Sequence, residues 1–120
     1  MLNLDTHILV FALSGTLTQK EQKILAAQPW GVCDIVFWEL SMLIRRGRIV
    51  LDLTDPQVMA VFSQLHVWPI SLEIADAIAL LDFRSDPADE LIAATSLFLK
   101  VPLVTRDAVI RKSKIVPFAD

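Results

Sequence analysis

Four acidic residues, Asp5, Glu39, Asp89 and Asp107, have the types and positions to form a reactive site. Three or four carboxylates in one cleft repel each other, and at least one takes up a proton unless a cation compensates. Mg²⁺ or Mn²⁺ would compensate, because these hard ions bind a few carboxylate oxygens and keep several waters and phosphate oxygens. Such an ion lowers the pKa of bound water and polarises a phosphoryl group, as phosphodiester hydrolysis requires. The four acids therefore predict a divalent-metal site.

Each acid also has a purely structural interpretation. Asp89 stands three positions after Asp86, the predicted N-cap of a helix, where free backbone amides and the helix dipole favour a carboxylate. Asp5 and Asp107 could cap helices in the same way. Capping does not readily explain Glu39, because its neighbours are apolar and a carboxylate is rarely buried without a partner. The residues alone leave both interpretations open.

The other reactive side chains offer less. Thr105 stands two residues before Asp107, so its hydroxyl is expected to contact a ligand phosphate or to position that acid. Cys33 is the one cysteine, which excludes an intrachain disulfide and a zinc-binding spacing, and it is interpreted as a small buried hydrophobe. His7 and His66 are both interpreted as structural, His66 because it lies in an apolar stretch without a motif.

The elements that position these residues alternate between short apolar strands and helices. Helix starts are marked by caps: Thr18 with Glu21 three residues later forms a capping box, Asp-Pro pairs stand at 55–56 and 86–87, and Ser71 precedes the apolar run that begins at Leu72. The predicted strands cover residues 1–4, 32–36, 67–70, 103–105 and 115–118, and the predicted helices cover 8–13, 18–28, 37–46, 55–65, 72–81, 86–99 and 107–112.

This order of elements predicts an α/β fold, a three-layer α/β/α sandwich with a mostly parallel central sheet. Parallel neighbours need a crossover connection, and buried parallel strands are continuous apolar runs. Pro69 favours an edge position for its strand. The length fits one domain over residues 1–120. Because ligands of open parallel sheets bind beyond the carboxyl ends of the strands, the four acids are expected to converge on one rim.

Composition bounds the class of protein. The chain has 120 residues, of which 54% are hydrophobic and 21% charged, so it is not disordered. A domain this small leaves much surface exposed, so the apolar composition predicts an oligomer or a dedicated protein partner. No apolar run is long enough to cross a membrane, and the N-terminus lacks the basic region of a signal peptide, which predicts a cytoplasmic protein.

The net charge of −3 does not by itself indicate nucleic-acid binding. Basic residues nevertheless cluster around 45–48 and 106–114, and local patches can bind RNA whatever the total charge. The residues expected to bind flanking phosphates are Arg45, Arg46, Arg106 and Lys112.

Four segments carry a resemblance. The chain reads Leu-Asp-Thr-His at 4–7, Phe-Trp-Glu-Leu-Ser-Met-Leu at 37–43, Asp-Pro-Ala-Asp-Glu-Leu-Ile-Ala-Ala-Thr at 86–95 and Pro-Leu-Val-Thr-Arg-Asp at 102–107. Together, in this order, they resemble the PIN-domain family, and most of all the VapC-type toxins of prokaryotic toxin–antitoxin pairs. The resemblance covers essentially the whole chain.

The resemblance implies a carboxylate pocket that binds Mg²⁺ or Mn²⁺ and cleaves RNA. By similarity, Asp5, Glu39, Asp89 and Asp107 match the four acids of the family, and Thr105 matches the hydroxyl residue two positions before the last acid. Asp5 and Asp89 would be the strongest metal ligands, while Glu39 and Asp107 would bind a second ion, act through water or orient the nucleophile. The resemblance also implies a cognate antitoxin and a homodimer.

The leading hypothesis is thus a metal-dependent endoribonuclease, the toxin of a toxin–antitoxin pair, in which a metal-activated water attacks the RNA backbone. The alternative is a catalytically inactive PIN-like binding module. A phosphoryl-transfer enzyme of the haloacid-dehalogenase kind is disfavoured, because it would need a second Asp where His7 stands. A receiver-like phosphoacceptor would need an acidic pair after the first strand, where the chain has only Asp5.

Overall fold

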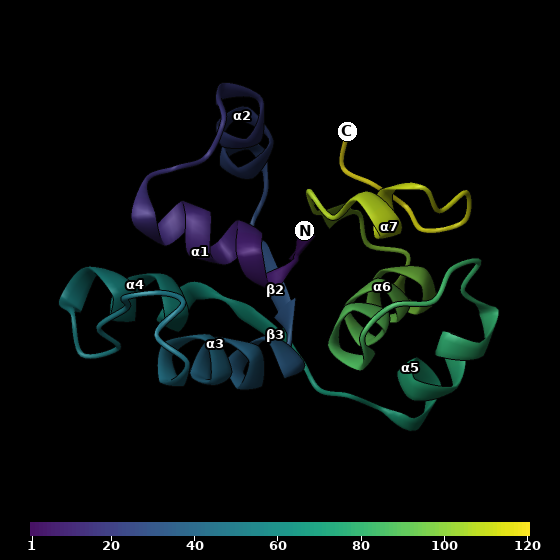
Figure 1. The fold of residues 1–120 in the computed structure, drawn as a ribbon. Helices are drawn as coiled ribbons and strands as arrows, with labels where there is room; N and C mark the ends of the chain where they lie inside the picture. The colour runs from purple at the N-terminus through teal and green to yellow at the C-terminus, as the bar shows by residue number, and fades with distance from the viewer.

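Four short parallel strands form the centre of the structure, a computed structural model that describes residues 1–120 (Figure 1). They are β1 (Leu2–Leu4), β2 (Trp30–Cys33), β3 (His66–Trp68) and β4 (Leu103–Val104). Their order in the sheet is β3-β2-β1-β4, and every neighbouring pair is parallel. The sheet is therefore parallel, as expected, and β3 is an edge strand, as Pro69 indicated.

Helices cover both sides of these strands. Figure 1 shows α1, α3 and α4 on one side of the strands and α5, α6 and α7 on the other. This arrangement confirms the three-layer α/β/α sandwich. The helices are α1 (Thr6–Ser14), α2 (Gln19–Ala27), α3 (Ile35–Arg45), α4 (Pro56–Gln64), α5 (Leu72–Ala77), continued by a 3₁₀ turn over Ile78–Leu80, α6 (Pro87–Leu99) and α7 (Ala108–Arg111).

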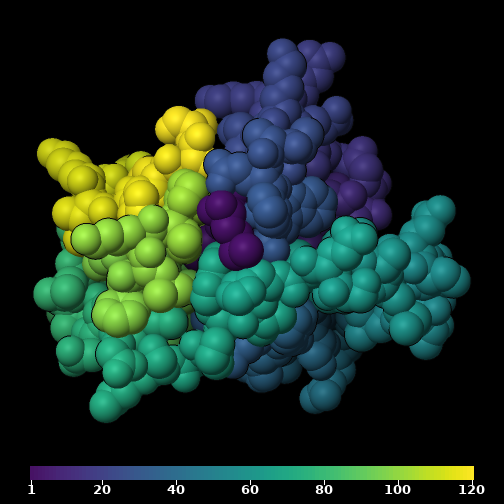
Figure 2. Space-filling model, turned by 180° about the vertical axis from the view of Figure 1, so that it is seen from behind, coloured from purple at the N-terminus to yellow at the C-terminus, as the bar shows by residue number.

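Strand β1 is central and wholly enclosed, which fixes the place of α6. Leu2 and Leu4 are completely buried in the main apolar core. Between them, the Asn3 side chain donates hydrogen bonds to the carbonyl of Ile92 at 3.0 Å and to the hydroxyl of Ser96 at 2.8 Å. Figure 2 shows the N-terminal end of the chain at the surface, surrounded by segments from later parts of the sequence. The bonds of Asn3 thus hold α6 against β1.

The predicted caps begin helices as expected, with one difference. Thr18 and Glu21 form the reciprocal capping box of α2, and Asp55 and Ser71 accept backbone N–H bonds at the starts of α4 and α5. Asp86 occupies the N-cap position of α6, but its side chain makes no capping hydrogen bond. The backbone therefore turns into α6 at Asp86 without help from the carboxylate.

Two strands begin and end earlier than the apolar pattern indicated. Strand β2 covers residues 30–33 rather than 32–36, because Asp34 already has helical dihedral angles and α3 begins at Ile35. A continuous apolar run cannot show where a buried strand ends and a buried helix begins. Strand β3 ends at Trp68 instead of Ile70, since Pro69 has no N–H to donate to a ladder.

The predicted last strand over 115–118 is wrong. Phe118 makes a single parallel bridge with Leu103, bounded by hydrogen bonds of Leu103 with Pro117 and Ala119. Pro117 cannot donate a backbone hydrogen bond, so the ladder does not extend. The segment nevertheless covers the outer edge of β4.

No helix in the structure combines the length and apolar character that a membrane span requires.

Candidate functional site

The candidate site lies where β1 ends and α1 begins. Asp5 is the N-cap of α1 and is only 5% exposed. Its Oδ1 accepts a hydrogen bond from the backbone N–H of Thr6 at 2.8 Å, and its Oδ2 accepts one from the hydroxyl of Thr105 at 2.6 Å. Asp5 thus caps a helix and also presents a fixed carboxylate at the carboxyl end of the central strand.

Glu39 comes to the same place from α3. Its Oε1 accepts a hydrogen bond from the hydroxyl of Thr6, which is itself buried. The sequence interpretation missed Thr6, although its position beside the first acid and at the end of a buried strand is a signal that could have found it. The Thr6 side chain connects the second acid to the segment that carries the first.

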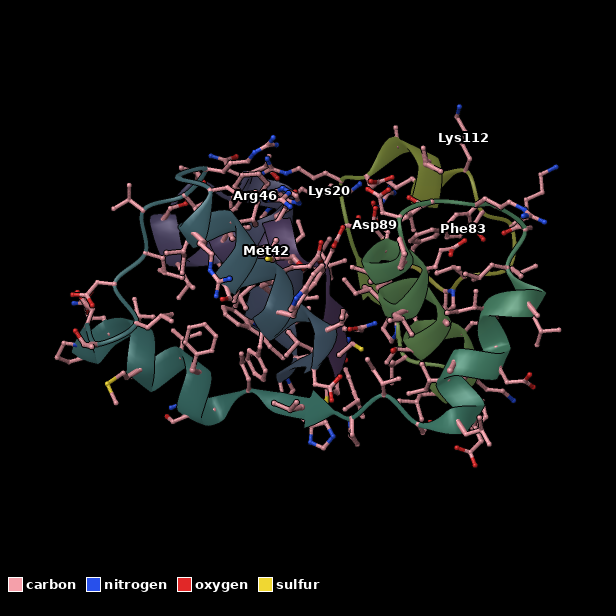
Figure 3. The ribbon with its side chains drawn as sticks, turned by 60° about the horizontal axis from the view of Figure 1, so that its bottom comes forward. Lys20, Met42, Arg46, Phe83, Asp89 and Lys112 are labelled. Carbon is pink, nitrogen blue, oxygen red and sulfur yellow. The ribbon has the colours of Figure 1, made fainter.

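Asp89 enters from the first turn of α6. It is partly buried, and its Oδ2 accepts a hydrogen bond from the Ser85 hydroxyl at 3.0 Å. Figure 3 shows Asp89 at the end of α6 that lies beside α3, with Met42 on α3 across from it. The capping interpretation is not needed to explain the orientation of Asp89, because its carboxylate accepts a hydrogen bond from a side chain of the preceding loop.

The structure brings three of the four predicted acids together. Asp5, Glu39 and Asp89 each offer a carboxylate oxygen, and these oxygens lie within 4.8 Å of one another. We call these three residues the acidic triad. Asp107 lies outside it and caps α7, where its Oδ1 accepts the backbone N–H groups of Val109 at 2.9 Å and Ile110 at 3.0 Å.

Thr105 links Asp107 to the triad. Its hydroxyl donates to Asp5 and accepts the backbone N–H of Asp107 at 3.0 Å. Because the hydroxyl proton points to Asp5, this side chain orients a carboxylate in the structure. The Thr105 hydroxyl thus contacts the Asp5 carboxylate and the Asp107 backbone, and that Thr105 positions the Asp107 carboxylate stays a prediction.

Burial and mutual repulsion work against ionisation of the triad. Removal from water raises the pKa of Asp5, of Glu39 and of Asp89, and it is the largest cause for each. The negative charges of the neighbouring acids raise the same pKa values further, and Asp107 contributes to this effect at Asp5 and at Asp89. The hydrogen bonds from Thr105, Thr6 and Ser85 act in the opposite direction.

These observations fit a hard divalent cation. The donor set of the triad is oxygen only, which suits Mg²⁺ or Mn²⁺ and not zinc. The repulsion that raises the three pKa values is the kind of field that a cation relieves. The Asp107 Oδ2 atom accepts no hydrogen bond in the structure, and the Asp107 charge acts on Asp5 and Asp89.

The predicted basic residues divide into two groups. Arg106 is held by Glu21 through two hydrogen bonds of 2.7 and 2.6 Å, and its guanidinium lies 3.9 Å from the centre of the Phe11 ring. This pairing lowers the pKa of Glu21 to about 2. Arg106 is therefore paired with Glu21 and packed on Phe11 in the structure, and its binding to phosphate stays a prediction. The other three predicted residues, Arg45, Arg46 and Lys112, form no ion pair in the structure.

The remaining side chains that the sequence singled out are those of His7, His66 and Cys33. His66 packs edge-on against Trp68, with ring centres 5.0 Å apart. His7 is exposed near Phe11. Cys33 is buried, and desolvation raises the pKa of its thiol. The burial of Cys33 agrees with its structural interpretation, whereas His7 lies close enough to the triad for its charge to counteract the raised pKa values of Asp5 and Glu39.

Comparison with solved structures finds chains with the same fold. One from a toxin–antitoxin complex of Klebsiella pneumoniae has a TM-score of 0.66 at 22% identity, covering 89% of this chain and 87% of that one. VapBC2 of Rickettsia felis, bound to a DNA fragment from its promoter, has a TM-score of 0.69 at 16% identity, covering 98% and 97%. FitAcB of Neisseria gonorrhoeae has a TM-score of 0.65 at 17% identity, covering 92% and 90%.

At these identities the likeness is one of fold. No curated protein sequence matches the chain. The sequence profile described as PIN domain matches residues 3–115, nearly the whole chain and the part that holds all four predicted acids. The parallel sheet, the carboxylates at its rim and this match lead to one conclusion: the chain belongs to the PIN domain family.

Proposed function

We propose that this protein is a Mg²⁺- or Mn²⁺-dependent endoribonuclease that acts as the toxin of a toxin–antitoxin pair. The observation that carries the proposal is the acidic triad at the carboxyl end of the central strand, in a family whose members are generally nucleases. A site built from oxygen ligands at the rim of a parallel sheet suits phosphodiester hydrolysis. We further propose that residues 1–120 work as one PIN-like domain.

Asp5, Glu39 and Asp89 would hold the ion, and Asp107 would complete the site from its free oxygen. The bound ion would supply Lewis acidity, lowering the pKa of a water and polarising the scissile phosphate of the RNA. Thr105 and Thr6 are positioning residues, since their hydroxyls fix the carboxylates of Asp5 and Glu39. A fixed set of ligands needs little reorganisation when substrate binds.

The proposed partners are RNA, an antitoxin and a second copy of the chain. Two of the similar structures come from proteins described as a toxin–antitoxin complex and as VapBC2. An open groove of about 320 Å³ between α3 and α4 supports a protein partner, because five of its six lining residues are apolar. They include Phe37, Leu53 and Met59, which are 39%, 52% and 55% exposed. An enzyme that cuts cellular RNA would act in the cytoplasm.

Two measurements on the partner-free protein test the proposal. The first is Mn²⁺ binding by proton relaxation, in wild type and in the double variant Asp5→Asn/Asp89→Asn. The second is cleavage of a mixed single-stranded RNA substrate, with Mg²⁺ and with EDTA. The control is Glu73→Gln/Asp76→Asn, which removes the same charge from two exposed acids on α5, outside the triad. We expect wild type and control to bind Mn²⁺ and cleave RNA, and the triad variant to do neither.

Cleavage that survives both EDTA and the triad substitutions would refute the mechanism. Equal Mn²⁺ binding in wild type and triad variant, without cleavage by either, would favour a catalytically inactive PIN-like binding module instead.

A further inference from the structure

A cavity of about 300 Å³ lies beside the acidic triad, between α3 and the start of α6. Glu39 belongs to both, so the cavity adjoins the triad directly. Trp38, Met42 and Arg46 form its α3 wall at intervals of one helical turn, and Asp86 lies on its α6 wall. Figure 3 shows Arg46 and Met42 along α3, with Asp89 beyond them at the end of α6. We call this cavity the α3–α6 cleft.

Trp38 differs from the other two tryptophans, because no contact within the fold explains its presence. The indole N–H of Trp30 donates to the carbonyl of Leu25 at 2.7 Å, and the ring of Trp68 covers Gly31 and packs against His66. Trp38 is 56% exposed and makes no hydrogen bond or aromatic contact in the structure. Its neighbour Phe37 points elsewhere, to the ring of Phe62 on α4. An exposed indole in a cleft offers a flat apolar surface to a ligand.

Arg46 is likewise uncommitted. The guanidinium groups of Arg106 and Arg111 are held by Glu21 and Asp120, but that of Arg46 forms neither an ion pair nor a hydrogen bond. A free guanidinium matches the geometry of a phosphate group. Asp86, on the facing wall, also has no partner, and its negative charge makes that wall unfavourable for phosphate. A phosphate in the cleft would therefore lie toward Arg46.

We propose that the α3–α6 cleft binds one nucleotide of single-stranded RNA next to the bond that is cut. The base stacks on Trp38, and the flanking phosphate pairs with Arg46. The volume is at the lower end of the range for small-ligand pockets, roughly 300–1,000 Å³, and suits a group of nucleotide size. An aromatic surface for a base, a nearby cation for phosphate and direct continuity with the triad are the features that single-stranded RNA needs. The inference rests on the proposed function and specifies how its substrate is held.

The test measures binding separately from cleavage. The probe is a fluorescein-labelled pool of random-sequence RNA pentamers, titrated by anisotropy with Ca²⁺ in place of Mg²⁺, and gel electrophoresis confirms that the pool stays intact. Trp38→Ala is compared with Trp38→Phe and with Phe98→Ala, which removes an aromatic side chain that is 47% exposed on the last turn of α6. Arg46→Ala is compared with Arg48→Ala, an exposed arginine that does not line the cleft.

Trp38→Ala should weaken binding about 5- to 150-fold, the effect of losing one base–aromatic stack. Trp38→Phe should keep most of the affinity, and Phe98→Ala should match wild type. Arg46→Ala should lower the slope of log affinity against log salt by about 0.7, the value for one phosphate contact on a single strand, and Arg48→Ala should leave it unchanged.

Equal affinity of Trp38→Ala and wild type, or no binding of the pool by wild type, would overturn the inference. A changed oligomeric state of Trp38→Ala with unchanged RNA affinity would also overturn it, since the cleft would then be a protein contact. The proposed nuclease function is judged separately. If wild type cleaves RNA and Trp38→Ala binds RNA as tightly as wild type does, the nuclease function stands and the proposed role of the cleft is refuted. Binding that depends on Trp38, without cleavage, would support the cleft and refute the nuclease.

Discussion

Neutralising one acid of the triad should stabilise the metal-free protein, and Asp89 is the acid to change. Its carboxylate accepts a single side-chain hydrogen bond, from Ser85 at 3.0 Å, which the oxygen of an asparagine can also accept. Asp5 accepts two, from Thr6 and Thr105, so its amide replacement would lose more. Asp89→Asn therefore removes charge with little loss of hydrogen bonding.

The spacing of the triad sets the magnitude. Two unit charges 4.8 Å apart repel by about 0.9 kcal/mol in water and by about 3.5 kcal/mol at an effective dielectric constant of about 20. Asp89 has two such neighbours, so the repulsion on its carboxylate is at least about 2 kcal/mol, the value for the dielectric constant of water. Proton uptake limits the repulsion to about 4 kcal/mol at pH 7, the free energy needed to protonate an ordinary carboxyl group.

Asp89 also lies in the first turn of α6, where its charge interacts favourably with the helix dipole by about 0.3–1 kcal/mol. After this loss, Asp89→Asn should raise the free energy of unfolding at pH 7 in EDTA by about 1–4 kcal/mol. Excess Mg²⁺ should make wild type more stable than Asp89→Asn. A ligand that binds the folded state stabilises it, and the variant has lost one ligating carboxylate.

The pH dependence has a definite sign. The raised pKa values of Asp5, Glu39 and Asp89 mean that the folded state binds protons more tightly than the unfolded chain. The contribution of the triad to wild-type stability in EDTA should therefore fall as pH rises from about 4, the ordinary carboxyl pKa, through the raised values. The advantage of Asp89→Asn should be present at pH 7 and absent below about pH 4.

Urea unfolding followed by circular dichroism measures the free energies of unfolding of both proteins, at pH 4 and pH 7, with EDTA or with excess Mg²⁺. The matched control is Asp86→Asn, which removes an exposed charge from the same helix end; this charge acts on Asp89 more weakly than those of Asp5 and Asp107 and offers no ligand atom to the triad. Its effect should stay within about 0.5 kcal/mol. If Asp89→Asn in EDTA at pH 7 is no more stable than Asp86→Asn, or gains equally at both pH values, then repulsion within the triad is not what the geometry indicates.

Three further predictions concern single residues around the site and the core. Thr105→Val, which removes the hydroxyl bonded to Asp5, should raise the pKa of that carboxyl and weaken Mn²⁺ binding, whereas Thr105→Ser should retain wild-type binding in the same relaxation titration. Gly31→Ala should destabilise the fold by about 1–3 kcal/mol in urea unfolding, because the added Cβ would lie 2.5 Å from the ring of Trp68; a neutral effect would show that the ring moves freely. Cys33 should react with a thiol reagent only at the rate of unfolding, since its thiol is buried with a raised pKa, and fast reaction of the native protein would contradict this burial.

The sequence determined those features that depend on a few neighbouring residues. The capping box of Thr18 and Glu21 forms as predicted, because both of its hydrogen bonds join residues three apart. Asp55 and Ser71 cap their helices for the same reason. The order of buried strands and amphipathic helices likewise predicts the parallel sheet, since parallel strands need helical crossovers. The fold class and the family resemblance were accessible at this level.

Tertiary structure decided how the acids divide. All four follow or precede strands in ways that made convergence on one rim plausible, yet Asp107 caps α7 while Asp5, Glu39 and Asp89 form the triad. The pattern of residue types is the same for a cap and for a ligand. Only the position of the helix axes relative to β1 decides whether a capping carboxylate also joins the triad, as that of Asp5 does and that of Asp107 does not.

The partners of the site side chains were also decided by tertiary structure. Thr105 reaches Asp5 across 100 positions, and Arg106 reaches Glu21 across 85. Such pairs depend on the strand order β3-β2-β1-β4, which places distant segments side by side, and no local pattern contains that order. The sequence therefore determined which residues could carry the chemistry. The packing of the helices on the sheet determined which of them meet, because hydrogen bonds and repulsion act over a few ångströms in space whatever the separation along the chain.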